Sequence, residues 1–151
     1  MPPTAPETDT AARLRAAIGR LARRLRPTEA AKAAGLTPTR IAVLQTLNRR
    51  GPMRLSELAE AEGINPTMLS RVIADLAEAG LVERTSDARD RRAAWVKATA
   101  AGKRLAERAR RERTDALNAA LEHLSAADRR SIEKALSALE ALAEALKERR
   151  P

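Results

Sequence analysis

Residues 65–97 read NPTMLSRVIADLAEAGLVERTSDARDRRAAWVK, and this stretch decides the fold. It opens with Asn65, a good helix N-cap, and Pro66, which suits a first helical position where no backbone N–H is needed. Gly80 is placed to end the helix in a left-handed conformation. Between these bounds apolar residues recur at i, i+3, i+4 and i+7, so one stripe of the helix is predicted to face a core: Leu69, Val72, Ile73 and Leu76.

The opposite face of this helix is polar and free of bulky groups, which suits close approach to a groove; it carries Thr67, Ser70, Arg71 and Ala74. A shorter helix is predicted before it, capped by Ser56 and ending at Gly63. A short helix, a tight turn and a second capped helix form the helix-turn-helix arrangement, whose second helix reads the DNA major groove. Residues 81–84 and 93–97 are predicted to be two short strands, so the polar loop between them is a wing.

The rest of the chain is predicted to be helical. Residues 10–26 form a first helix, residues 28–34 a helical connector and residues 37–50 a third helix, and two longer helices follow over 99–123 and 125–149. The first and last helices carry narrow apolar stripes, and helices with such short stripes are not stable in water without a packing partner. We expect these stripes to pack between the subunits of a homodimer through Leu14, Ile18, Leu21, Leu25, Ile132, Leu136, Leu139 and Leu146.

The predicted fold class is therefore mostly α with a small β-wing, and 151 residues suit a single core of useful size. We expect four segments along the chain. They are a disordered leader (1–9), an N-terminal dimerisation helix with its connector (10–36), a winged helix-turn-helix lobe (37–99), and a long helix followed by a C-terminal dimerisation helix (100–151).

Charge and composition favour double-stranded DNA as the partner. The formal net charge of +9 and the pI near 11.2 indicate a polyanion, although an anionic membrane would attract the chain too. No apolar run approaches the ~20 residues of a membrane span, so no membrane partner is expected. Trp95 is the only Trp, Tyr or Phe of the sequence and is expected to pack under the wing, so the aromatic platforms that bind single strands are absent.

The same composition argues against catalysis. The chain has no cysteine, which excludes disulfides and thiolate metal sites within it, and its one histidine, His123, has no neighbouring metal-ligand pattern. The six glycines are isolated and form no phosphate-binding motif. We therefore expect a cytoplasmic protein that is not an enzyme and uses no cofactor and no metal.

Three segments resemble the MarR family of transcriptional regulators. Residues 55–82 contain LSELA, INPTMLSR and LAEAGLV, residues 87–92 (DARDRR) match the family's wing signature D-x-R-x-x-R, and residues 97–102 (KATAAG) are similar to its strand-to-helix junction. The likeness covers about residues 10–146. It implies a winged helix-turn-helix homodimer of bacterial type that occupies a pseudo-palindromic operator, usually as a repressor, and that a small-molecule effector can release.

The start of the reading helix is the candidate major-groove site: Asn65, Pro66, Thr67, Ser70 and Arg71. The alternative is a solvated helix face on which Arg71 pairs with Asp75 one turn away. Three further residues are weaker candidates for contacts to the DNA backbone: Arg54, Ser56 and Arg84.

In the wing, the resemblance implies that Arg89 enters the minor groove and that Asp87 orients its guanidinium group, with Arg91 and Arg92 beside them. The alternative is a solvated loop with internal ion pairs. The effector is left open: without Tyr or Phe its pocket would be aliphatic with arginine as counter-charge, which suits a small anionic or hydrophobic molecule.

Two other functions stay open at this point. One is an architectural protein that binds double-stranded DNA without sequence preference and without an effector. The other is a protein-interaction dimer that has lost DNA binding.

Overall fold

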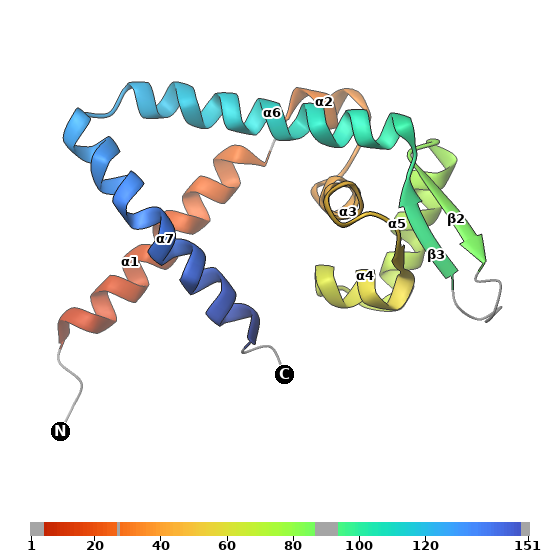
Figure 1. Ribbon diagram of the computed structural model, residues 1–151, viewed down its shortest axis with the longest axis horizontal. Helices are drawn as coiled ribbons and strands as arrows, with labels where there is room; N and C mark the ends of the chain where they lie inside the picture. Colours follow the sequence, from red (N-terminus) through yellow and green to blue (C-terminus); the bar gives the residue numbers. More distant parts are fainter. Residues whose placement is uncertain (1–4, 27, 87–93, 149–151) are drawn as a thin grey trace. The chain divides into compact units, whose positions relative to one another are not determined.

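A computed structural model describes residues 5–26, 28–86 and 94–148 of the chain. Within these ranges the chain is largely helical with a small antiparallel sheet, which confirms the predicted fold class (Figure 1). The helices are α1 (Ala5–Leu25), α2 (Glu29–Ala33), α3 (Pro38–Arg50), α4 (Leu55–Glu62), α5 (Pro66–Glu78), α6 (Ala100–Glu122) and α7 (Ala126–Glu148). The strands are β1 (Met53–Arg54), β2 (Val82–Ser86) and β3 (Ala94–Ala98), in the order β1-β3-β2.

The chain forms two compact units, one ending at Thr114 and the other beginning at Asp115. Helices α3, α4 and α5 of the first unit pack on one another and against the sheet (Figure 1). The expected division into segments at residues 36/37 and 99/100 stays a prediction.

The core of the first unit is apolar and lies between the helices and one face of the sheet. The four residues of the predicted α5 stripe are all buried, which confirms the spacing argument: Leu69, Val72, Ile73 and Leu76. They join side chains of the other elements, chiefly Ile41, Val43, Leu44, Leu47, Leu58 and Val96. This core fixes which face of α5 remains exposed.

Two helices begin earlier than predicted. Helix α1 starts at Ala5, so it includes residues that were expected to belong to a disordered leader. Helix α4 is preceded by Arg54 as its N-cap residue, and Ser56, the expected cap, lies inside the helix. Arg54 is extended (φ −71°, ψ 147°) because it belongs to β1, and its backbone N–H donates to the Glu57 carboxylate at 3.3 Å.

The junction between β3 and α6 is held by Thr99, as a helix cap. Its backbone N–H donates to the carbonyl oxygen of Leu81 at 3.0 Å, and its hydroxyl donates to the carbonyl oxygen of Gly80 at 2.7 Å. The hydroxyl also accepts from the N–H of Gly102 at 3.1 Å. The first turn of α6 therefore packs closely against Gly80 and Leu81, which follow α5, and a Cβ at Gly102 would lie only 2.0 Å from the Leu81 carbonyl oxygen.

The sheet places Trp95 differently from the expectation that it packs under the wing. Val96 and Ala98 are buried on the core side of β3, whereas Trp95 lies on the alternate side and is half-buried. The guanidinium carbon of Arg54, its register partner on β1, lies 5.5 Å from the centre of the indole ring, which is a cation–π distance.

Candidate nucleic-acid interface

Helix α5 begins where the sequence predicts. The Asn65 side-chain oxygen accepts a hydrogen bond from the Met68 N–H at 2.8 Å, and Pro66 occupies the first helical position. Gly63 ends α4 in a left-handed conformation (φ 64°), and Gly80 follows α5 with φ 71°. The turn between α4 and α5 is therefore short and locally determined, as a helix-turn-helix requires.

The face of α5 opposite its buried stripe is exposed and mostly polar; it carries Thr67, Ser70, Arg71 and Ala74. A groove of about 760 Å³ runs between this helix and the first turn of α3. It brings together three of the predicted reading residues, Asn65, Thr67 and Arg71, with three residues at the start of α3 that were not predicted as part of the site: the N-cap residue Thr37, Thr39 and Arg40.

Asp75 in the same groove pairs with Arg40 of α3, not with Arg71 as the alternative reading supposed. The two side chains are 44% and 30% exposed, so the ion pair is partly shielded from water. Among the residues that the structure describes, the Arg71 side chain makes no hydrogen bond or ion pair. Its guanidinium group is therefore available to a ligand in the groove.

The base of the wing is a regular two-stranded ribbon. Strands β2 and β3 pair from Val82 opposite Ala98 to Ser86 opposite Ala94, and Lys97 forms a 3.0 Å ion pair with Glu83 across the ribbon. Arg84 is exposed on β2. The predicted wing residues lie outside the described residues: Asp87, Arg89, Arg91 and Arg92.

The remaining backbone candidates lie near the start of α4. Ser56 is exposed in its first turn, and Arg54 is exposed with its guanidinium group over the ring of Trp95. These positions leave both residues reachable from solvent, and their roles stay predictions.

A second hollow of about 480 Å³ lies between α1, α3 and α6 within the first unit. Arg113 reaches into it from α6: its Nη1 donates to the side-chain oxygen of Gln45 at 2.7 Å, and its Nε donates to the Leu25 carbonyl oxygen at 3.1 Å. About half of the other lining residues are apolar, among them Ala22, Pro38, Ala42 and Ile64, and two are charged, Arg26 and Glu62. This role could not be read from the sequence, because Arg113 lies in the basic run of residues 108–113 (RARRER), a pattern that is typical of a solvated helix face.

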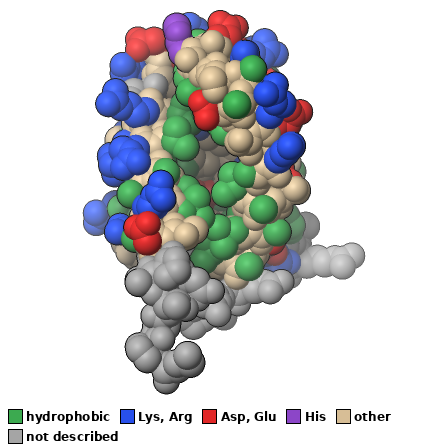
Figure 2. All heavy atoms as spheres, turned by 90° about the vertical axis from the view of Figure 1, so that its left-hand side faces the viewer, with side chains coloured by type: hydrophobic (Ala, Val, Ile, Leu, Met, Phe, Trp, Pro, Cys, Tyr) green, Lys and Arg blue, Asp and Glu red, His purple; other side chains and the backbone are tan. Residues whose placement is uncertain are grey.

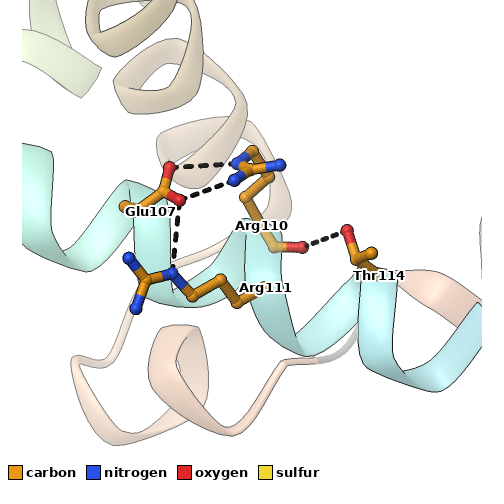
Figure 3. Close-up of polar contacts among 4 residues, drawn as sticks. All are labelled: Glu107, Arg110, Arg111 and Thr114. Carbon is orange, nitrogen blue, oxygen red and sulfur yellow. Dashed lines mark hydrogen bonds and ion pairs between the residues drawn. The ribbon is translucent and has the colours of Figure 1, made fainter.

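The exposed side of α6 carries a strongly coupled charge cluster (Figure 3). Glu107 accepts hydrogen bonds from Arg110 at 2.6 and 3.0 Å and from Arg111 at 3.3 Å. The bonds from Arg110, with the charges of both arginines, lower the pKa of Glu107 to about 2. The carboxylate therefore stays ionised at any physiological pH, and Glu107 raises the pKa of Arg110 in turn.

Helices α1 and α7 each leave large apolar side chains uncovered (Figure 2). On α1, Ile18 and Leu21 are exposed while Leu14 and Leu25 are half-buried. On α7 the exposed set includes all four residues predicted for dimerisation: Ile132, Leu136, Leu139 and Leu146. Leu21 and Leu136 expose 55% and 49% of their surface, which is unusual for leucines at regular helical spacing.

The described ranges contain no group of three or more His, Cys, Asp or Glu side chains that could hold a metal ion. In the same ranges no helix has the length and apolarity needed to span a membrane.

Comparison with known proteins points to one family. The model of the MarR family matches residues 36–94. An uncharacterised HTH-type transcriptional regulator of Mycobacterium bovis is 32% identical over 126 residues, which cover 83% of this chain and 87% of that protein. An uncharacterised HTH-type transcriptional regulator of Mycobacterium leprae is 35% identical over 99 residues, which cover 66% of this chain and 68% of that protein.

Solved structures with the same fold include NadR in complex with 4-hydroxyphenylacetate, with a TM-score of 0.70 and 27% identity over 95% of this chain and 96% of that one. Wild-type MarR from E. coli in its apo form has a TM-score of 0.74, and the match covers 85% of this chain and 94% of that one. Its identity of 21% makes that likeness one of fold alone.

Proposed function

Because the chain belongs to the MarR family of transcriptional regulators, we propose that it is a sequence-specific DNA-binding repressor that acts as a homodimer on a pseudo-palindromic operator. The observation that carries this proposal is the division of α5 into a fully buried apolar stripe and an exposed polar face next to a groove. The proposal also places the protein in a bacterial cytoplasm and gives it no enzymatic role.

In the proposed complex the first turns of α5 enter the major groove. Arg71, whose guanidinium group is uncommitted among the described residues, is suited to the O6 and N7 atoms of guanine, and Thr67 and Ser70 are short enough for base edges or phosphates. The backbone N–H groups at the start of the helix, beside Asn65 and Pro66, can hold a phosphate. The wing adds Arg89 in the minor groove, oriented by Asp87, with Arg91 and Arg92 near phosphates.

The homodimer is proposed to form through the uncovered apolar faces of α1 and α7. Leucines and isoleucines left half exposed at heptad-like spacing are unfavourable in a monomer and are what a helical interface buries. A dimer of this kind would set two copies of α5 in successive major grooves about 34–36 Å apart. Half-site spacing would then depend on how the two subunits pack.

The hollow beside Arg113 is the proposed effector site. Its apolar lining residues suit a small hydrophobic molecule, and its two cations, Arg26 and Arg113, outnumber its one carboxylate, Glu62, which favours a ligand that bears a carboxylate. NadR, which shares the fold, was solved with 4-hydroxyphenylacetate, an aromatic carboxylate. Such a ligand would act by favouring a dimer whose half-site spacing no longer matches the operator.

A selection of genomic fragments bound by the full-length protein tests the proposal, because it yields the half-site spacing directly. The selected duplex should bind at least ~10³-fold more tightly than a random duplex at physiological salt. A ratio near one would favour the architectural alternative, and a flat titration on every fragment would favour a protein-interaction dimer.

Variants of the arginines then separate the two reading elements. Arg71→Ala and Arg89→Ala should each weaken binding to the selected duplex about 5- to 100-fold at matched salt, whereas Arg49→Ala, an exposed arginine at the end of α3, serves as the control. If Arg89→Ala bound the selected duplex as tightly as the wild-type protein, the proposed minor-groove role of Arg89 would be rejected.

A further inference from the structure

The ion pair between Asp75 and Arg40 lies in the groove that contains the reading face. Arg40 is in the first turn of α3 and Asp75 is in the third turn of α5, and both line the groove together with Thr67 and Arg71. The pair joins residues 35 positions apart, so it exists only because α3 packs against α5.

The two arginines of this groove are in different electrostatic states. Arg40 contacts a carboxylate and is 70% covered, whereas Arg71 is exposed and has no charged partner among the described residues. One cation is therefore neutralised at short range and the other is not. Nothing in the core explains an acidic residue here, because Asp75 keeps 44% of its side chain in contact with water.

An acidic residue beside a DNA-reading face has a cost and a benefit. It repels phosphates, so it lowers affinity for every duplex. A free cation in the same place would bind phosphates of any sequence and add to non-specific affinity through counterion release. Pairing the cation removes that sequence-independent contribution and leaves discrimination to groups that read base edges.

Resting on the proposed DNA-binding function, we infer that Asp75 sets the selectivity of the interface by keeping Arg40 neutralised and docked on α5. Asp75 is then a positioning residue: it acts through Arg40 and touches no base. Arg71 remains the one arginine of this groove that is offered to DNA.

The test compares Asp75→Asn with wild-type protein on two probes, the duplex selected by the wild-type protein and a random duplex of equal length, over a series of salt concentrations. Asn keeps the shape and a hydrogen-bonding oxygen but loses the charge, so the charge of Arg40 is no longer neutralised and its guanidinium group is held less tightly. We expect tighter binding to the random duplex, a salt dependence steeper by about 0.9 for each new phosphate contact, hence about 1.8 for a homodimer, and a selectivity ratio lowered about 3- to 30-fold.

Three matched variants make the outcome specific. Arg40→Gln in the Asp75→Asn background should return the salt dependence to the wild-type value, because the released cation is gone. Asp75→Glu should behave as wild type, because it keeps the charge. Glu29→Gln frees Lys32 from a 2.9 Å pair on α2, outside the groove, and raises the net charge equally, so it should leave the selectivity ratio unchanged.

An unchanged salt dependence and random-duplex affinity in Asp75→Asn would overturn the inference. Equal losses of affinity for both duplexes, together with a lowered melting temperature, would also overturn it, because the ion pair would then contribute to stability alone. If the wild-type protein shows no sequence preference, the proposed repressor function is rejected. The comparison of Asp75→Asn with wild type on the random duplex still tests whether Asp75 neutralises Arg40. No DNA binding by the wild-type protein would reject both.

Discussion

Replacing Gly102 by alanine should destabilise the first unit even though alanine is the better helix former. The new Cβ would lie 2.0 Å from the Leu81 carbonyl oxygen and 3.0 Å from Cδ1 of Leu44, where ordinary contact begins at 3.4 Å. The first turn of α6 must therefore move away by about 1.4 Å, which disturbs the 3.0 Å hydrogen bond from Thr99 to Leu81.

The size of the effect follows from three contributions. Overpacking against backbone costs about 3 kcal/mol, at the upper end of the usual range. Weakening the hydrogen bond adds about 1 kcal/mol, and the better helix propensity of alanine returns about 1 kcal/mol. We expect a net loss of about 3 kcal/mol in the free energy of unfolding.

Urea unfolding followed by far-ultraviolet circular dichroism measures this loss, at one fixed protein concentration because a dimer's stability depends on it. Gly19→Ala is the matched control: Gly19 is also helical, and its added Cβ would meet only the flexible end of Arg23 at 3.5 Å. It should gain about 0.5–1 kcal/mol. If Gly102→Ala were as stable as wild type, the close packing of α6 on Leu81 would be wrong.

Two further predictions concern α6 and α7. The Glu107 carboxyl should titrate with a pKa of about 2 in carbon-13 NMR, because Arg110 and Arg111 stabilise its ionised form, and Arg110→Ala should move that pKa upward. Since the folded pKa lies below the ordinary 4.5, the stabilisation is complete above about pH 4.5 and is lost as the pH falls toward 2; a titration near 4.5 in the wild-type protein would contradict the geometry. Leu136→Glu should weaken the proposed homodimer by more than tenfold in sedimentation equilibrium, because each leucine buried at an interface contributes about 1.5–3 kcal/mol. The control Glu133→Gln on the same helix should dimerise as the wild-type protein does. If Leu136→Glu dimerised with wild-type affinity, the interface would have to lie elsewhere.

The parts of the fold that sequence predicts well are those that depend on local signals. The ends of α5 follow from the cap at Asn65 and the glycine at position 80, and the burial of its apolar stripe follows from helical spacing. The predicted start of α4 is wrong. Ser56 is the better N-cap by residue type, but the pairing of β1 with β3 makes Arg54 the last extended residue before the helix.

Long-range polar contacts could not be predicted in the same way. Spacing of one turn pointed from Asp75 to Arg71, whereas the true partner, Arg40, reaches it only through the packing of α3 on α5. Likewise Arg113 and Glu112 lie in a basic run, yet Arg113 binds Gln45 and Glu112 accepts the Ala30 N–H at 3.1 and 3.2 Å. These partners lie 68 and 82 residues away, where periodicity carries no information.

Trp95 gives the protein a single intrinsic fluorophore. As the only Trp, Tyr or Phe in the sequence it is the sole source of intrinsic ultraviolet fluorescence, and it lies on β3 with the Arg54 guanidinium group over its ring. A ligand that draws Arg54 from the indole should therefore change the emission without any attached dye. The chain thus contains a single native reporter, located at the base of the wing.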